Sequence, residues 1–330
     1  MQPSRRAFLT GRRPPRSPWD TFCERVSAAA VGELKQGDRP RLVLGHPQDA
    51  WRARELAEAH GITLALWEGP GGAAQPACLW LDPGALKAWR VEGDAIVAEP
   101  GCPVGLLAAQ GCAQFAQADP AQTVAAWLAG ATGYIEPADS GLLAATVMFS
   151  DGTVEPLGAF GAADTQPLRS ATVQSLVPAL FQLAGSADAQ ACAGPQGWTA
   201  RFRLDAMREP ANLAQVLLGH GGALGWVQDS RWTRGQPAAE PRQRSREGWR
   251  LDMRVKALFD PHGRFPEIRE PGRKSKIAPH PPAPAARRHS VFLSTFTFDR
   301  PPWMPIFAKP RWNITSTAVP AKSRSHRPSN

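Results

Sequence analysis

The sequence predicts an α+β protein, and three observations lead to that class. A short apolar run, an amphipathic helix and a second apolar run follow one another over 41–69, which is the order of a βαβ unit. Two later segments, 91–101 and 142–158, have the pattern of antiparallel hairpins. A helix over 254–259 then runs into Asp-Pro and Gly263, which stop a helix and turn the chain.

The first unit is the clearest in the sequence. Residues 41–45 predict a short strand, and the helix over 47–60 has Pro47 in its first turn and Gly61 at its end. Residues 62–69 then predict a buried strand that ends in a Gly-rich turn.

The remaining elements are assigned from shorter patterns. The hairpin over 142–158 turns at Asp151 and Gly152, between two runs rich in β-formers. The other expected elements are a strand at 77–82, a helical turn at 83–89, a helix at 102–111, a strand at 199–205, a helix, turn and strand within 210–228, and a loop at 230–248.

The net charge of +9 does not belong to the body of the chain. Residues 271–330 contain 11 Lys and Arg but a single acid, Asp299, together with 11 of the 33 prolines. The rest is close to neutral, so the folded part has no global footprint for nucleic acid, and the tail is predicted to be unstructured. No apolar run reaches the roughly 18 to 20 residues of a membrane span, so none is expected.

Cysteine spacing and the N-terminus bear on location. The five cysteines form no C-x-x-C pair, so neither a zinc site nor an iron–sulfur cluster is predicted, and we interpret them as buried residues in a reducing compartment. Residues 4–9 fit the twin-arginine pattern S-R-R-x-F-L, but an Arg- and Pro-rich stretch follows where a signal peptide has its apolar region. We therefore predict a basic, Pro-rich arm over 1–40 and a cytoplasmic protein.

The Gly-rich turn after the second strand is the first candidate site. Glycines allow a backbone to approach a phosphate closely, although any tight turn has a similar composition. The residues of this loop are Glu68, Gly69, Pro70, Gly71, Gly72 and Ala73.

The order of segments resembles that of the FAD-linked oxidases with a vanillyl-alcohol-oxidase or p-cresol-methylhydroxylase (PCMH) type of flavin domain. The resemblance covers roughly 41–268, and within the family it is greatest to FAD-binding subunits of the glycolate-oxidase type. It rests on the segment 91–101, which corresponds to the family's strand ending in V-x-P-G, on the Asp-Gly hairpin (142–158) and on the terminal F-D-P-x-G (259–263).

The resemblance implies an FAD held between two subdomains of a PCMH-type domain over 41–205. It also implies a reduced α/β cap with a closing helix over 206–270, before the disordered basic tail, 271–330. The pyrophosphate is expected along the first Gly loop and along a second segment, which consists of Thr123, Val124, Ala125 and Ala126. The flavin performs the redox step and the protein places it.

The implied function is oxidation of a 2-hydroxy acid, with hydride transfer to flavin N5. The partners implied are a catalytic flavoprotein subunit and an iron–sulfur subunit, in a hetero-oligomer. The chain itself is expected to have no metal site. No catalytic residue is assigned, because His46, His220 and His262 all occupy turns or helix ends, where a histidine more often caps or is solvated.

Two alternatives remain open. Pro70 lacks an N–H donor, Ala73 replaces a glycine or hydroxyl residue, and Ala125 and Ala126 replace the family's two glycines. These departures favour a non-catalytic subunit that retains the flavin-domain fold. A third interpretation is a basic adaptor that acts through its tails.

Overall fold

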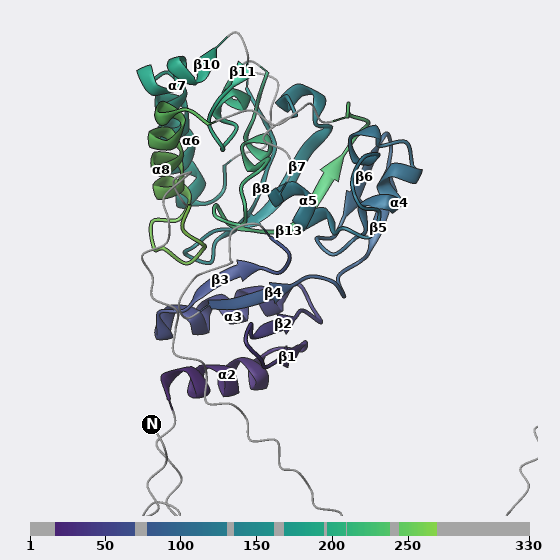
Figure 1. Cartoon of the computed structure of the whole chain (residues 1–330), viewed down its shortest axis with the longest axis vertical. Coiled ribbons are helices and arrows are strands. Elements are labelled where there is room, and N and C mark those ends of the chain that lie inside the picture. Colours follow the sequence, from purple (N-terminus) through teal and green to yellow (C-terminus); the bar gives the residue numbers. More distant parts are fainter. Residues whose placement is uncertain are drawn as a thin grey trace, which may run out of the picture. The chain divides into compact units, whose positions relative to one another are not determined.

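The computed structural model of the chain describes residues 17–69, 78–130, 135–161, 168–194, 197–208, 210–237 and 244–268. These residues form helices together with parallel and antiparallel sheets, so the predicted α+β class is confirmed. The two larger sheets of this part of the chain have four and five strands (Figure 1). The predicted tail, 271–330, lies outside the described residues.

The four-stranded sheet has the order β1-β2-β4-β3 and is drawn in purple and blue in Figure 1. The pair β1–β2 is antiparallel, and the other two pairs are parallel. Its strands are β1 (Glu33–Lys35), β2 (Arg41–Val43), β3 (Thr63–Leu66) and β4 (Cys78–Asp82), with helices α2 (Pro18–Ala29) and α3 (Gln48–His60). The predicted βαβ unit is thus present, and Gly61, with φ of 63°, ends α3 in the left-handed conformation.

Helix α2 lies within the segment 1–40, which the sequence predicts as an arm. Ser17 and Asp20 form a reciprocal capping box at its start, and its buried side chains, Phe22, Cys23 and Val26, pack against the four-stranded unit. Only three of its twelve side chains are buried, so the helix has a weak apolar pattern. The Arg- and Pro-rich residues before it then dominate the composition of the segment. Residues 18–29 therefore differ from the predicted arm, while the domain limits as a whole stay a prediction.

Asp49 fixes the connection after α2 to the start of α3. Its buried carboxylate accepts the backbone N–H groups of Val31, Gly32, Gly45 and His46 at 2.8–3.1 Å. Burial raises the pKa of Asp49, but these donors outweigh it and hold the pKa below its usual value. The carboxylate thereby makes α2 and β1 part of the four-stranded unit.

The five-stranded sheet is antiparallel and has the order β5-β6-β13-β7-β8. Its strands are β5 (Trp89–Glu92), β6 (Ala95–Ala98), β7 (Leu142–Met148), β8 (Val154–Leu157) and β13 (Trp226–Trp232). Both predicted hairpins are confirmed, and they turn at Gly93 and Gly152 with φ of 62° and 87°. The helical turn predicted over 83–89 is wrong, because 83–88 contain a turn at 84–85 but no helix, and Trp89 begins β5.

Strand β13 lies at the centre of this sheet, between the two hairpins. The sequence places residues 206–270 in a reduced cap and closing helix, whereas 226–232 are part of the main sheet. Trp232, fully buried, packs against Phe115 and Trp127 at ring distances of 5.1 and 5.6 Å. A strand that pairs with partners so distant in sequence gives no local signal of its position.

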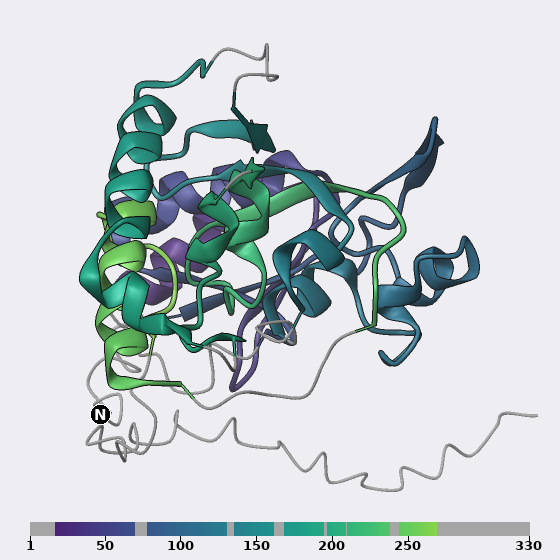
Figure 2. The ribbon, with the colours of Figure 1, turned by 90° about the horizontal axis from the view of Figure 1, so that it is seen from above.

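Helices flank the five-stranded sheet, and Figure 2 shows α6 and α8 side by side on one flank. The helices are α4 (Val104–Ala109), α5 (Val124–Gly130), α6 (Ala171–Ala184), α7 (Ala187–Cys192) and α8 (Arg246–Phe259). Short strand pairs join β9 (Ala159–Phe160) to β12 (Ala211–Asn212) and β10 (Ala193–Gly194) to β11 (Gly197–Trp198). The 3₁₀ helices are η1 (Ala113–Phe115), η2 (Pro137–Asp139), η3 (Leu204–Met207) and η4 (Leu213–Leu217).

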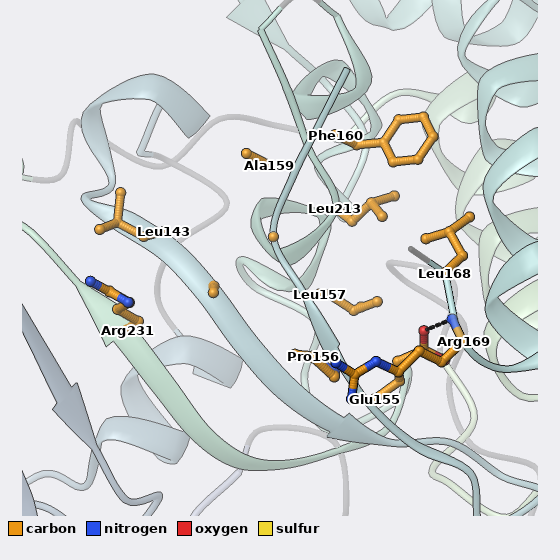
Figure 3. Close-up of a pocket in the computed structure, with 12 residues that line it drawn as sticks. Leu143, Glu155, Pro156, Leu157, Ala159, Phe160, Leu168, Arg169, Leu213 and Arg231 are labelled. Carbon is orange, nitrogen blue, oxygen red and sulfur yellow. Dashed lines mark hydrogen bonds between the residues drawn. The ribbon is translucent and has the colours of Figure 1, made fainter. Parts of the chain in front are cut away.

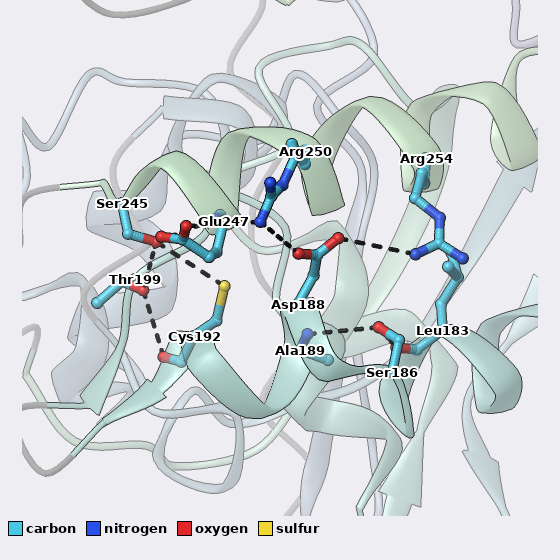
Figure 4. A network of polar contacts seen from close by, with 11 residues as sticks. Leu183, Ser186, Asp188, Ala189, Cys192, Thr199, Ser245, Glu247, Arg250 and Arg254 are labelled. Carbon is cyan, nitrogen blue, oxygen red and sulfur yellow. Dashed lines mark hydrogen bonds and ion pairs between the residues drawn. The ribbon is translucent and has the colours of Figure 1, made fainter.

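A polar network holds α7 against α8 (Figure 4). Asp188 accepts a hydrogen bond from Arg250 Nη2 at 2.8 Å and lies 3.9 Å from Arg254 Nη1. Ser245 caps the N-terminus of α8, and its Oγ lies 3.0 Å from Thr199 Oγ1. The arginines are about half exposed, so the network orients the helices more than it stabilises them.

The predicted strand over 199–205 is wrong. Phe202, Arg203 and Leu204 are all fully buried, so the exposure does not alternate, and η3 begins at Leu204. The guanidinium of Arg203 donates to Ile135 O at 2.9 Å and pairs with Asp205. The sequence pattern fails here because an arginine counted as solvent-facing is buried with its own partners.

Candidate functional site

The two sheets meet at a junction, which is the place where the predicted cofactor segments would have to converge. Leu66 at the end of β3, Ala125 in α5, Trp226 at the start of β13 and Phe265 after α8 belong to one apolar cluster. This cluster includes the core of the four-stranded sheet, so the units share buried surface there.

The first predicted segment leaves the four-stranded sheet at the end of β3. Trp67 N donates to Leu81 O at 2.8 Å, and Gly69 N donates to Leu66 O at 3.1 Å. Glu68, with an exposed side chain, has φ of 64°, a conformation that is uncommon for a residue with a Cβ. Pro70, Gly71, Gly72 and Ala73 lie outside the described residues.

Aromatic and charged side chains support this turn on the sheet face opposite to the helices. The Arg41 guanidinium lies over the Trp67 ring at 4.5 Å and pairs with Asp82 at 3.3 Å. Trp67 in turn meets Trp80 edge to face at 6.0 Å. These contacts fix the start of the first segment before it leaves the described part of the chain.

The second predicted segment is the start of α5, and its donors have partners inside the protein. Val124 N donates to Cys102 O and Ala125 N donates to Pro100 O, each at 2.9 Å, while Ala126 N donates to Thr123 Oγ1 at 3.2 Å. A helix start can bind phosphate only through N–H groups that are free to point at it. As the described residues stand, this turn does not offer those donors.

A third segment at the junction was not predicted as a site. The loop 219–225 contains Gly219, Gly221 and Gly222 with φ of 74°, 66° and 74°. Gly219 N and Gly221 N donate to the carbonyls of Leu128 and Ala129, each at 2.9 Å, so the loop is hydrogen-bonded to the C-terminal end of α5. Several glycines around a histidine, directly before a strand, are the sequence signal that could have identified it.

His220 in this loop differs from the sequence interpretation as a capping or solvated residue. Its side chain is 3% exposed, and Nδ1 has no hydrogen-bond partner among the described residues. Burial, and then the charge of Arg201, lowers the pKa of His220 to about 3. The imidazole is therefore neutral at pH 7, with an unsatisfied ring nitrogen at the junction.

A cavity of about 10 Å³ joins these segments, lined by Leu66, Ala125, His220, Gly222, Trp226 and Phe265 among others. That volume is room for about one water molecule. The residues around His220 fit a nucleotide in kind, because they combine close backbone approach with an unsatisfied polar atom. The N–H groups at the start of α5 do not fit a pyrophosphate, because they already donate to atoms of the protein. The cavity is also too small for a flavin unless the segments at the junction move apart.

The closing turn after α8 seals the junction. Asp260 accepts the N–H groups of Arg264 and Phe265 at 2.8 and 2.9 Å and pairs with the buried Lys256. Arg264 O accepts the N–H of Leu64 at 2.8 Å, which extends the edge of β3. The F-D-P-x-G motif thus brings the end of α8 onto the four-stranded sheet, with the Phe265 ring buried between the units.

The cysteines are unpaired and buried, as the sequence predicts; they are Cys23, Cys78, Cys102, Cys112 and Cys192. Within the described ranges, no group of three or more His, Cys, Asp or Glu is placed to hold a metal ion. None of the helices described here is long and apolar enough to cross a membrane.

No protein-family model and no curated protein sequence matches the chain. Among solved structures, it is similar to the glucooligosaccharide oxidase of Acremonium strictum, which carries a 6-S-cysteinyl, 8α-N1-histidyl FAD (13% identity, 65% of this chain and 42% of that chain, TM-score 0.41). It is also similar to 6-hydroxy-D-nicotine oxidase of Arthrobacter nicotinovorans (14%, 68% and 41%, TM-score 0.37). A third is 4-ethylphenol oxidase of Gulosibacter chungangensis (14%, 66% and 42%, TM-score 0.39).

The chain spans about two fifths of the length of these solved structures, 41–42%. At TM-scores of this size the likeness does not assign an activity to the chain.

Proposed function

We propose that the chain is an FAD-binding subunit of an oxidoreductase. The observation that supports it is the meeting of separate segments at one junction. Leu66, next to the first predicted loop, and Ala125, in the second predicted segment, line the same cavity. The resemblance in segment order supplies the choice of FAD. When bound, FAD would accept a hydride from the substrate.

Within this proposal, His220 positions the cofactor. A neutral imidazole donates a hydrogen bond from one ring nitrogen and accepts one at the other, and Nδ1 has no partner among the described residues. The glycines beside it allow the backbone to approach a planar group closely. The apolar residues Leu66, Trp226 and Phe265 would exclude water from the same place.

The finer assignment rests on sequence resemblance. The substrate we propose is a small 2-hydroxy acid, and the partners are a catalytic flavoprotein subunit and an iron–sulfur subunit of a cytoplasmic complex. An iron–sulfur partner suits a chain with no C-x-x-C spacing of its own. The pyrophosphate contacts we propose are those of the first loop, from Glu68 to Ala73.

A second candidate is a non-catalytic subunit that keeps this fold. It is favoured by the internal partners of the Val124, Ala125 and Ala126 donors and by the small volume of the junction cavity. In that case the junction would serve to hold the units together, and the unsatisfied His220 would be a cost without a function.

The visible absorbance of the purified full-length protein, between about 350 and 500 nm, separates the two candidates. A flavin spectrum, with flavin content reduced several-fold in His220→Phe at unchanged thermal stability, supports the first. The matched control is His262→Phe, which changes an exposed histidine of the closing turn and should retain the flavin. A colourless protein that does not take up added FAD contradicts the first and leaves the structural subunit.

A further inference from the structure

A pocket of about 320 Å³ opens on the five-stranded sheet beside β7 and β8 (Figure 3). Its volume is at the lower end of the range for small-molecule sites, about 300–1,000 Å³. Of the described residues that line it, none also lines the junction cavity. The pocket is therefore a separate place on the molecule.

The lining of the pocket is part polar and part apolar, and its apolar part is mainly aliphatic. Its apolar side chains are Leu143, Leu157, Phe160, Leu168 and Leu213 (Figure 3). They come from β7, β8, β9, η4 and the segment before α6, so the tertiary fold assembles this surface. Leu143 is 38% exposed, and a ligand that covered it would remove apolar area from water.

Arg169 supplies the charge of the pocket, and Glu155 sets its position. The Glu155 side chain, 4% exposed, accepts the backbone N–H groups of Arg169 and Ser170 at 2.7 and 3.0 Å and the Ser170 hydroxyl. The carboxylate is thus engaged with the backbone and not with the guanidinium. In Figure 3 the Arg169 side chain extends from its backbone, which Glu155 holds, across β8 toward Pro156.

The two arginines of the pocket are not equivalent. Arg231, on the far side of β7 in Figure 3, lies 3.7 Å from a carboxylate oxygen of Glu92. The guanidinium of Arg169 has no carboxylate partner among the described residues. A planar guanidinium that no described carboxylate engages, beside apolar side chains, is an arrangement that can bind a carboxylate at one end of an apolar molecule.

We propose that this pocket binds an aliphatic monocarboxylate, with its carboxylate at Arg169 and its hydrocarbon chain on the leucine wall. The Glu155 carboxylate holds the backbone of Arg169 in place, and Arg231 lines the other side of the pocket. The assignment does not depend on FAD binding, because it uses no residue of the junction.

The test is an NMR titration of the ¹⁵N-labelled full-length protein with hexanoate, followed at the amides of Gly158 and Ala159. Hexanol and hexylamine have the same chain without the negative charge. Arg169→Gln removes the anchor, and Ala159→Trp fills the pocket from an exposed strand position that tolerates an aromatic residue. Arg25→Gln, on the remote helix α2, is the matched control for loss of one positive charge.

We expect saturable shifts with hexanoate and at least about tenfold weaker binding of hexanol and hexylamine, because the Arg169 guanidinium favours an anion. Arg169→Gln and Ala159→Trp should each weaken hexanoate binding about fivefold or more, and Arg25→Gln should not. Equal binding of hexanoate and hexanol overturns the proposal. So does unchanged affinity in both pocket variants, or an equal loss in Arg25→Gln. Should one pocket variant fail to fold, the other decides by the same criterion.

Discussion

The junction cavity and the sheet pocket lie at opposite ends of one strand, β13. Trp226 and Val227 line the junction, where a space of only about 10 Å³ is surrounded by apolar side chains, by backbone donors that already have partners and by the unsatisfied Nδ1 of His220. Arg231 lines the sheet pocket, which has a volume of about 320 Å³. There the guanidinium of Arg169 has no carboxylate partner among the described residues. A segment rich in glycine or in helix-start N–H groups can therefore bind a ligand only through polar groups that have no partner inside the protein, which at the junction leaves His220 rather than the start of α5.

The largest effect is expected where the junction is sealed. Phe265→Ala removes a buried ring that packs between the units, so the free energy of unfolding should fall by about 3–5 kcal/mol. Urea denaturation measures this change, and Phe181→Ala, at an exposed position of α6, is its control. A loss below about 1 kcal/mol would mean that the junction is not held by this ring.

A smaller effect is expected at the second connection between the units. Arg54 of α3 donates through Nε to Ser150 O at 2.8 Å, in the turn of the β7–β8 hairpin. Arg54→Met keeps an unbranched apolar stem and leaves that carbonyl without its donor, so the free energy of unfolding should fall by about 1–3 kcal/mol. Arg52→Met, two residues earlier in the same helix, is the matched comparison. Equal stability of the two variants would show that the Arg54 bond contributes nothing specific.

The unsatisfied histidine predicts a pH dependence. The pKa of His220 falls from 6.5 in the unfolded chain to about 3 in the folded chain. Between these two values the unfolded chain binds a proton that the folded chain does not, so the free energy of unfolding decreases as the pH falls below 6.5. His220→Phe should be near the wild type at pH 7. Its advantage should then grow as the pH falls, by up to about 1.4 kcal/mol per pH unit.

Denaturant unfolding at pH 7, 6 and 5 measures this difference between the two proteins. His262→Gln tests whether the loss of any histidine has the same consequence. Parallel stability curves for the wild type and His220→Phe would contradict the burial of a neutral imidazole at the junction.

The smallest effect is expected at the open pocket. Arg169 is exposed, so Arg169→Gln should change the free energy of unfolding by less than about 0.5 kcal/mol. Thermal denaturation gives the value. A larger loss would make Arg169 a structural residue, and the contrast between a tightly packed junction and a roomier pocket would weaken.

Local signals predict much of the fold. The two hairpins have Asp or Gly turns between β-rich runs, and α3 has a Gly stop and apolar spacing, so the sequence places them correctly. The closing helix α8 is present, but both ends of the loop predicted over 230–248 are wrong, because β13 continues to Trp232 and α8 begins at Arg246. Helix α2 was missed because few of its side chains are buried, and the central position of β13 was missed because its partners are distant in sequence. The Arg203 segment was wrong because its charge is satisfied inside the protein.

The site is less predictable than the fold. The sequence identifies Val124 and Ala125 as candidate phosphate donors, but their partners, the carbonyls of Cys102 and Pro100, are defined only by the tertiary structure. His220 was interpreted as a helix-end residue, although it is buried. Pro70, Gly71, Gly72 and Ala73 lie outside the described residues, so that part of the prediction stays a prediction.

The five buried thiols have a consequence for chemical labelling. Burial raises the pKa of each, to about 11 for Cys23 and Cys102 and to about 12 for Cys78, so alkylating reagents meet few thiolates in the folded chain. Cys23 and Cys78 lie in the four-stranded unit, and the other three lie around the five-stranded sheet. Peptide mapping of the order in which the cysteines become alkylated would therefore report which unit opens first.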